Sequence, residues 1–177
     1  ALAADGEGAL YVYNLVADGY SSGSIGAMDS YSLDTVDLGG ADVTIVPGGS
    51  SSTAAGPSGD SASIVDLTAG DLTMYRTAPS MDNIDIDVLT ISGNAPGNDA
   101  IEGNDWSTSG ITVSGCGFTV VADSVTSDWV AGSCSNSAAP NTITLSDYDA
   151  TYTGTMNALY ARNSAITIGV GSIAMPA

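Results

Sequence analysis

The sequence of 177 residues has no histidine, no lysine and only two arginines, against 18 aspartates and two glutamates, so its net charge is −18. Without histidine or lysine, the common nucleophile–base pairs and Schiff-base chemistry are absent. Carboxylates alone can cleave glycosidic bonds, but no pair stands out among the acids. We therefore do not expect an enzyme. Nucleic acid and anionic membranes repel so acidic a surface, and neither is expected as a partner.

Long apolar runs are also missing: no stretch approaches the roughly 18 residues that a membrane-spanning helix needs, so we expect no membrane span. The chain begins with Ala rather than Met, as an exported protein does after loss of its signal peptide, although a trimmed chain would look the same. These features favour an extracellular or cell-surface location.

Cysteine is scarce, and Cys116 and Cys134 are the only two. An even pair in a chain that looks exported favours a disulfide in an oxidising compartment. The segment between them is typical of a hairpin with its turn near Asp123 and Ser124. The bridge closes a loop of about 19 residues and should contribute about 3 kcal/mol to stability.

Short alternating runs separated by small residues are the main positive signal, as in Ile111–Val121, ITVSGCGFTVV. Such units, with apolar residues at positions 0, +2, +7 and +9, start at residues 36, 65, 111, 143 and 166, and a shortened copy without the last apolar position starts at residue 84, so the steps are 19 to 32 residues. Alternation predicts strands with one apolar face. We expect an all-β fold in one domain over 1–177, of the β-sandwich or jelly-roll type. A β-solenoid built from this loose 19–32-residue repeat is the alternative.

The first strong strand signal, ALYVYNLV, has apolar residues on both faces and lies near the start of the chain. Residues 1–16 are therefore a candidate donor strand that pairs with a neighbouring subunit. Leu10, Val12 and Val16 are the candidate plugging side chains, and Ile166 and Ile168 the candidate lining of the acceptor edge. An ordinary central strand is the alternative for this segment.

Residues 94–110 are expected to form a long loop that carries the most metal-like stretch of the sequence. Five oxygen-bearing side chains lie close together there: Asn98, Asp99, Glu102, Asn104 and Asp105. Calcium takes six to eight oxygen ligands, so this loop could supply part of a shell, although its spacing differs from an EF-hand. Calcium is the one cofactor suggested, and a solvated acidic loop is the alternative. Trp106 in this loop is a candidate for stacking on a sugar, or for filling the core beneath the loop.

In composition and strand layout, the whole chain resembles bacterial and archaeal surface-fibre subunits that assemble by donor-strand exchange. The resemblance implies a structural subunit of an extracellular filament, pilus-like fibre or surface layer, with other copies of itself as partners. The alternative is a calcium-dependent surface adhesin or carbohydrate-binding module that uses residues 97–105 and Trp106 to hold a glycan.

Overall fold

The computed structural model describes residues 15–18, 31–40, 42–46, 58–96, 100–151 and 159–174, and the regular structure in these ranges is entirely β-strand. The strands are β1 (Leu15–Asp18), β2 (Tyr31–Asp37), β3 (Val43–Val46), β4 (Ser58–Thr68), β5 (Leu72–Tyr75), β6 (Ala78–Ser92), β7 (Ala100–Val113), β8 (Thr119–Thr126), β9 (Trp129–Ser133), β10 (Asn141–Thr151), β11 (Leu159–Arg162) and β12 (Ser164–Ala174). The prediction of an all-β fold is confirmed.

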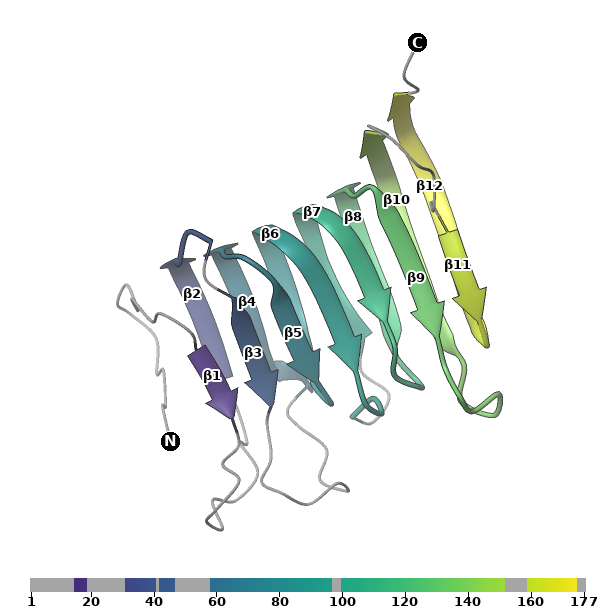
Figure 1. Ribbon diagram of the computed structural model, residues 1–177, viewed down its shortest axis with the longest axis horizontal. Helices are drawn as coiled ribbons and strands as arrows, with labels where there is room; N and C mark the ends of the chain where they lie inside the picture. The colour runs from purple at the N-terminus through teal and green to yellow at the C-terminus, as the bar shows by residue number, and fades with distance from the viewer. Residues whose placement is uncertain are drawn as a thin grey trace.

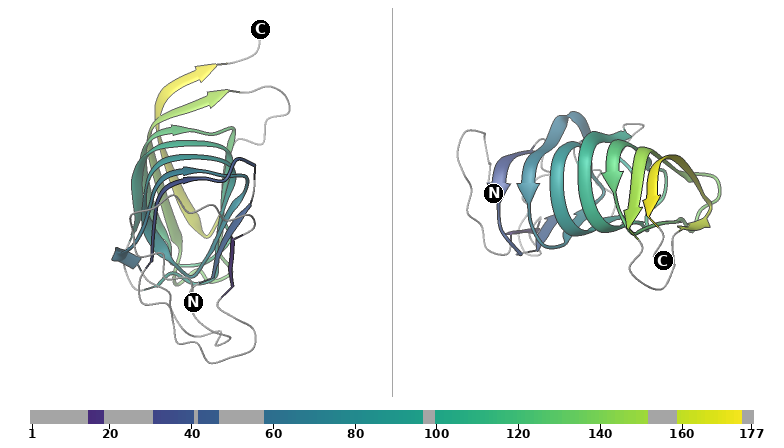
Figure 2. Two further views of the ribbon diagram at one scale, coloured as in Figure 1. Left: turned by 90° about the vertical axis from the view of Figure 1, so that its left-hand side faces the viewer. Right: turned by 90° about the horizontal axis from the view of Figure 1, so that it is seen from above.

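The strands stack in two faces, and every pairing between them is parallel. The first face runs β2, β4, the first half of β6, the first half of β7, β8, β10 and β12. The second face runs β1, β3, β5, the second half of β6, the second half of β7, β9 and β11. The chain alternates between the faces and winds as a coil, with the strands nested when viewed along the stack (Figures 1 and 2).

Of the two predicted architectures, the parallel pairing matches the solenoid, because a jelly roll is built from antiparallel strands. The coils are uneven. Residues paired between neighbouring coils are 17 apart in sequence from Ile64 to Met81, but 31 apart from Leu33 to Ile64. The sequence repeat also drifts in phase. The units that start at residues 36 and 65 begin on the first face, whereas the unit at Ile111 begins on the second face, at the end of β7.

The core lies between the two faces, because side chains at alternate positions point inward and stack in columns one coil above the next. One such column on the first face consists of Val36, Leu67, Ile84, Trp106, Val125 and Tyr148, all of them buried. The positions between these columns face solvent, which gives the strands their alternating burial. Stacking the coils buries apolar side chains that no single coil could cover.

The prediction of a loop over residues 94–110 is wrong for most of that segment, because β7 begins at Ala100. Trp106 lies in the core with 2% of its surface exposed, and its Nε1 donates a hydrogen bond to the carbonyl oxygen of Met81 at 2.7 Å. Gly103 makes this possible: a Cβ atom there would lie 1.6 Å from the same oxygen and 3.0 Å from Nε1 of Trp106. The indole is therefore not accessible to a sugar.

Candidate functional site

A bend recurs in the first-face strands, and the residue at the bend has a positive φ in six successive coils. These residues are Thr35 (φ 52°), Asp66 (53°), Asn83 (54°), Asp105 (57°), Ser124 (51°) and Asp147 (43°). The register of the flanking residues stacks them in one column, which we call the bend column. Short polar side chains tolerate the left-handed region because they can hydrogen-bond locally, which explains most of this composition.

Neutral residues separate the carboxylates along the bend column and along two nearby columns. The column before the bend holds Asp34, Val65, Asp82, Asn104, Asp123 and Ser146, and the column two residues after it holds Asp37, Thr68, Asp85, Ser107, Thr126 and Asp149. In none of the three does an aspartate lie next to another aspartate of its column. Like charges directly opposite each other destabilise a sheet, so this separation lowers repulsion in a very acidic region.

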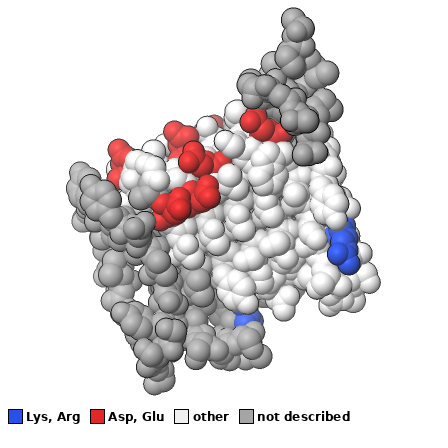
Figure 3. Space-filling view, viewed as in Figure 1, with Lys and Arg blue, Asp and Glu red and all other residues white. Residues whose placement is uncertain are grey.

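These three columns form what we call the acidic corner, near the edge where the chain turns from the first face to the second. Acidic side chains gather along that upper edge (Figure 3). Neutral groups bond the carboxylates: Nδ2 of Asn83 donates to Oδ1 of Asp66, and the amide of Asn104 donates to Oδ1 of Asp82 at 2.9 Å. The corner therefore presents an ordered negative field that attracts cations from solution.

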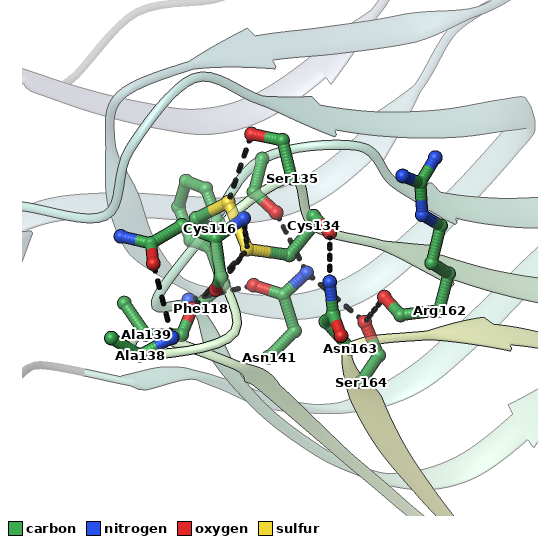
Figure 4. The surroundings of a disulfide bond; sticks show 12 residues. Cys116, Phe118, Cys134, Ser135, Ala138, Ala139, Asn141, Arg162, Asn163 and Ser164 are labelled. Carbon is green, nitrogen blue, oxygen red and sulfur yellow. Dashed lines mark hydrogen bonds between the residues drawn. A yellow bond between two sulfur atoms is a disulfide. The ribbon is translucent and has the colours of Figure 1, made fainter.

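The disulfide lies at the opposite corner and joins two neighbouring coils (Figure 4). Cys116 and Cys134, the predicted pair, are bonded with a Cα–Cα distance of 4.9 Å. Buried Asn141 supports this corner, because its Nδ2 donates to the oxygen of Gly115 at 2.7 Å and its Oδ1 accepts from the amide of Phe118 at 3.0 Å. The predicted hairpin is wrong: β8 and β9 lie on different faces, and Asp123 lies within β8.

The described part of the stack has two open ends, which lie at opposite sides of the molecule (Figure 1). β1 and β2 close one end, and β11 and β12 close the other; within the described part of the chain, each of the four has strand partners on one side only. Unpaired edges present free backbone donors and acceptors to any further strand. At the β11–β12 end, Leu159 is 57% and Tyr160 56% exposed, while Ile166 and Ile168 are partly buried.

The predicted interface residues fall partly on these ends. Leu10 and Val12 lie outside the described residues, whereas Val16 belongs to β1 and pairs with Thr44 of the same chain. Ile166 and Ile168 belong to β12, the last strand of the first face, where they pack against the core of their own chain. The structure therefore places Val16 at one end of the stack and the two isoleucines at the other.

The predicted calcium ligands are only partly described. Asn98 and Asp99 lie outside the described residues, while Glu102, Asn104 and Asp105 are all exposed on β7. Across the described ranges, no three acidic, cysteine or histidine residues are close enough together to hold a metal ion.

Searches of protein-family models, curated proteins and solved structures return no match to this chain. No helix long and apolar enough to cross a membrane occurs in the ranges that the structure covers. Two features escaped the sequence reasoning: the bend column and the open second-face edge of β11 with Arg162. The bend column left a signal, since polar residues occur one position before a buried apolar residue in coil after coil, but this signal is readable only once the register is known.

Proposed function

We propose that this chain is a structural subunit of an extracellular filament or surface layer, assembled by adding strands of one copy to the open sheet edges of the next. The observation that carries the proposal is the pair of open ends, each with one edge strand per face. Strand addition forms main-chain hydrogen bonds along an edge, and apolar side chains at alternate positions set its register.

The composition supports the same function. Two arginines and no lysine leave very few cleavage sites for trypsin-like proteases. The disulfide favours an oxidising compartment, where a structural protein must persist without cellular repair. The acidic corner runs along one side of the stack, and its charge would keep neighbouring filaments apart.

The open ends favour strand addition over strand exchange. Val16 and the rest of β1 already pair with β3 of their own chain, so this segment can serve as an edge without leaving its subunit. A joint of that kind requires no unfolding of either copy before assembly, and the ordering cost of binding stays small.

Electron microscopy of negatively stained protein, with sedimentation velocity over a wide concentration range, tests the proposal. We expect filaments or concentration-dependent oligomers of the full chain. Removal of residues 1–18 deletes β1. In the same measurements this shortened chain should be monomeric or should associate more weakly than the full chain, while it remains β-rich. A full chain that remains monomeric at every concentration would contradict the function.

A further inference from the structure

The two faces of the stack carry equal numbers of strand segments, and their order lets the coil continue from one copy into another. Seven segments lie on each face within the described residues. Among the described strands, the first, β1, lies on the second face and the last, β12, lies on the first face. The next segment of an uninterrupted coil would therefore lie on the second face, which is where β1 of another copy would be.

The second-face edges match residue by residue. β11 reads Leu-Tyr-Ala-Arg and β1 reads Leu-Val-Ala-Asp, both four residues long. The strand pairing within the chain places Leu15 and Leu159 in one column, and Asp18 and Arg162 each lie three residues after that column, at the end of their strands. Extending that register by one coil sets Arg162 opposite Asp18 of the next copy. Opposite charges at directly paired positions stabilise a sheet, and such a pair favours one register over the others.

Arg162 is well suited to that role. The chain has only two cations, and the other, Arg76, is buried with 8% of its surface exposed, whereas Arg162 lies on a fully exposed strand. A blue patch marks the right-hand end of the molecule, where β11 lies (Figure 3). One exposed positive charge on a surface of many negative ones directs a second copy to this end.

Leu159 leaves an apolar side chain exposed at the β11 end of the described stack. Its column consists of buried residues in the preceding coils: Val43, Leu72, Leu89, Ile111 and Val130. Leu159 continues the column but is 57% exposed, because no described coil covers it. Terminal coils of solenoids that remain single need a polar cap, whereas the last described strand of the second face presents leucine. A further coil with Leu15 at the same position would cover it.

The first-face edges are compatible with the same stacking. In the register of the chain, Ile168 continues the column of Leu33, and Ser172 follows Asp149 in the column that begins with Asp37. Pairing β12 with β2 of another copy would place a serine position between two aspartates. The separation of carboxylates in the acidic corner would then continue across the joint, without two aspartates in contact.

We infer that copies of this chain stack head to tail, with β11 pairing in parallel with β1 of the next copy, β12 with β2, and Arg162 opposite Asp18. This geometry rests on the proposed function, and it adds the partner edges, their direction and their register. Each joint repeats the contact that already holds neighbouring coils together.

Charge reversal tests the register. Arg162→Asp and Asp18→Arg should each weaken self-association at least about tenfold, because each places like charges at the joint. The double variant, Arg162→Asp with Asp18→Arg, should recover association to within a few-fold of the parent. Asp87→Arg is the control, since this exposed residue lies in β6, in the middle of the stack, and the net charge changes as in Asp18→Arg. Sedimentation and microscopy provide the readout, and melting curves verify that each variant folds.

Cross-linking tests the joint directly. A mixture of Tyr160→Cys and Val16→Cys proteins, treated with a short bis-maleimide, should give dimers linked at these two positions by mass spectrometry. Tyr160→Cys mixed with Thr90→Cys should not, because Thr90 lies in the same column but in the middle of the stack. If filaments form but the double variant does not recover association, or the specific cross-link is absent, this geometry alone is overturned. A parent chain that never associates would overturn it together with the proposed function.

Discussion

Asn83 lies between Asp66 and Asp105 in the bend column, and its Nδ2 donates a hydrogen bond to Oδ1 of Asp66. Neighbouring strands of a sheet are about 4.8 Å apart, so carboxylates at adjacent positions of one column would repel each other strongly. The neutral amide of Asn83 separates the carboxylates of Asp66 and Asp105 and donates a hydrogen bond to the first of them. The acidic composition is therefore compatible with a tightly stacked sheet only because of which residues occupy each column.

Replacement of Asn83 by aspartate should expose this dependence. Asn83→Asp removes the donor to Asp66 and places three carboxylates in succession, so the free energy of unfolding should fall by about 1 kcal/mol near pH 7. The loss should shrink at high salt, which screens the repulsion between exposed carboxylates. Urea unfolding at low and at high salt measures it. Asn136→Asp is the control, since the exposed Oδ1 of Asn136 already accepts from the amide of Ala138; equal losses in the two variants would refute the role of stacking.

Gly103→Ala should lower the free energy of unfolding far more than the addition of one methyl group usually does. A Cβ atom at Gly103 would lie 1.6 Å from the backbone oxygen of Met81, and this oxygen cannot retreat without breaking its bond with Trp106. We expect a loss of at least about 3 kcal/mol, together with a shift in tryptophan fluorescence. Gly40→Ala is the matched control, because nothing lies within 4 Å of a Cβ atom there. A stable Gly103→Ala protein with unchanged fluorescence would contradict this packing.

The alternation of apolar and polar residues was sufficient to predict an all-β fold but not the solenoid. One-sided alternation is typical of antiparallel sheets with a solvated face, whereas parallel sheets are usually covered on both faces. Here parallel strands have one solvated face, so their pattern is the same as that of a sandwich. The uneven coils, from 17 residues after Ile64 to 31 after Leu33, also obscure the repeat that would have distinguished the two.

Sequence reasoning failed where tertiary contacts override local signals. Asp99, Gly103 and Asp105 are residue types typical of a loop, yet the segment from Ala100 forms β7. The strand forms because the bend column accepts Asp105 in a left-handed conformation and because Gly103 makes room for Trp106. The relation between Arg162 and Asp18 was equally hidden. Both residues end short strands 144 positions apart, and the register of the intervening coils relates them only through the column of Leu15 and Leu159, three residues earlier in each strand.

Reduction of the disulfide should lower stability by about 3 kcal/mol, the loop-closure estimate for a bridge that spans 18 positions. Guanidinium unfolding with and without a reductant measures the difference as a lower midpoint for the reduced chain. A variant with Cys116→Ala and Cys134→Ala should give the same midpoint in both conditions. If reduction left the midpoint of the parent unchanged, the bridge would contribute nothing to holding these two coils together.

Tyr31 should make the folded chain sensitive to alkaline pH. Burial raises the pKa of its hydroxyl well above the ordinary value of 10.0, although the hydrogen bond with Oγ1 of Thr77 at 2.9 Å opposes part of this shift. Above about pH 10 the unfolded chain loses this proton while the folded chain retains it, so stability is complete below that pH and falls above it by up to about 1.4 kcal/mol per pH unit. Urea unfolding between about pH 8 and pH 11 should therefore show a steeper decline for the parent than for Tyr31→Phe. Tyr160→Phe, which alters an exposed tyrosine, should decline as the parent does; if all three declined alike, Tyr31 would not be the group responsible.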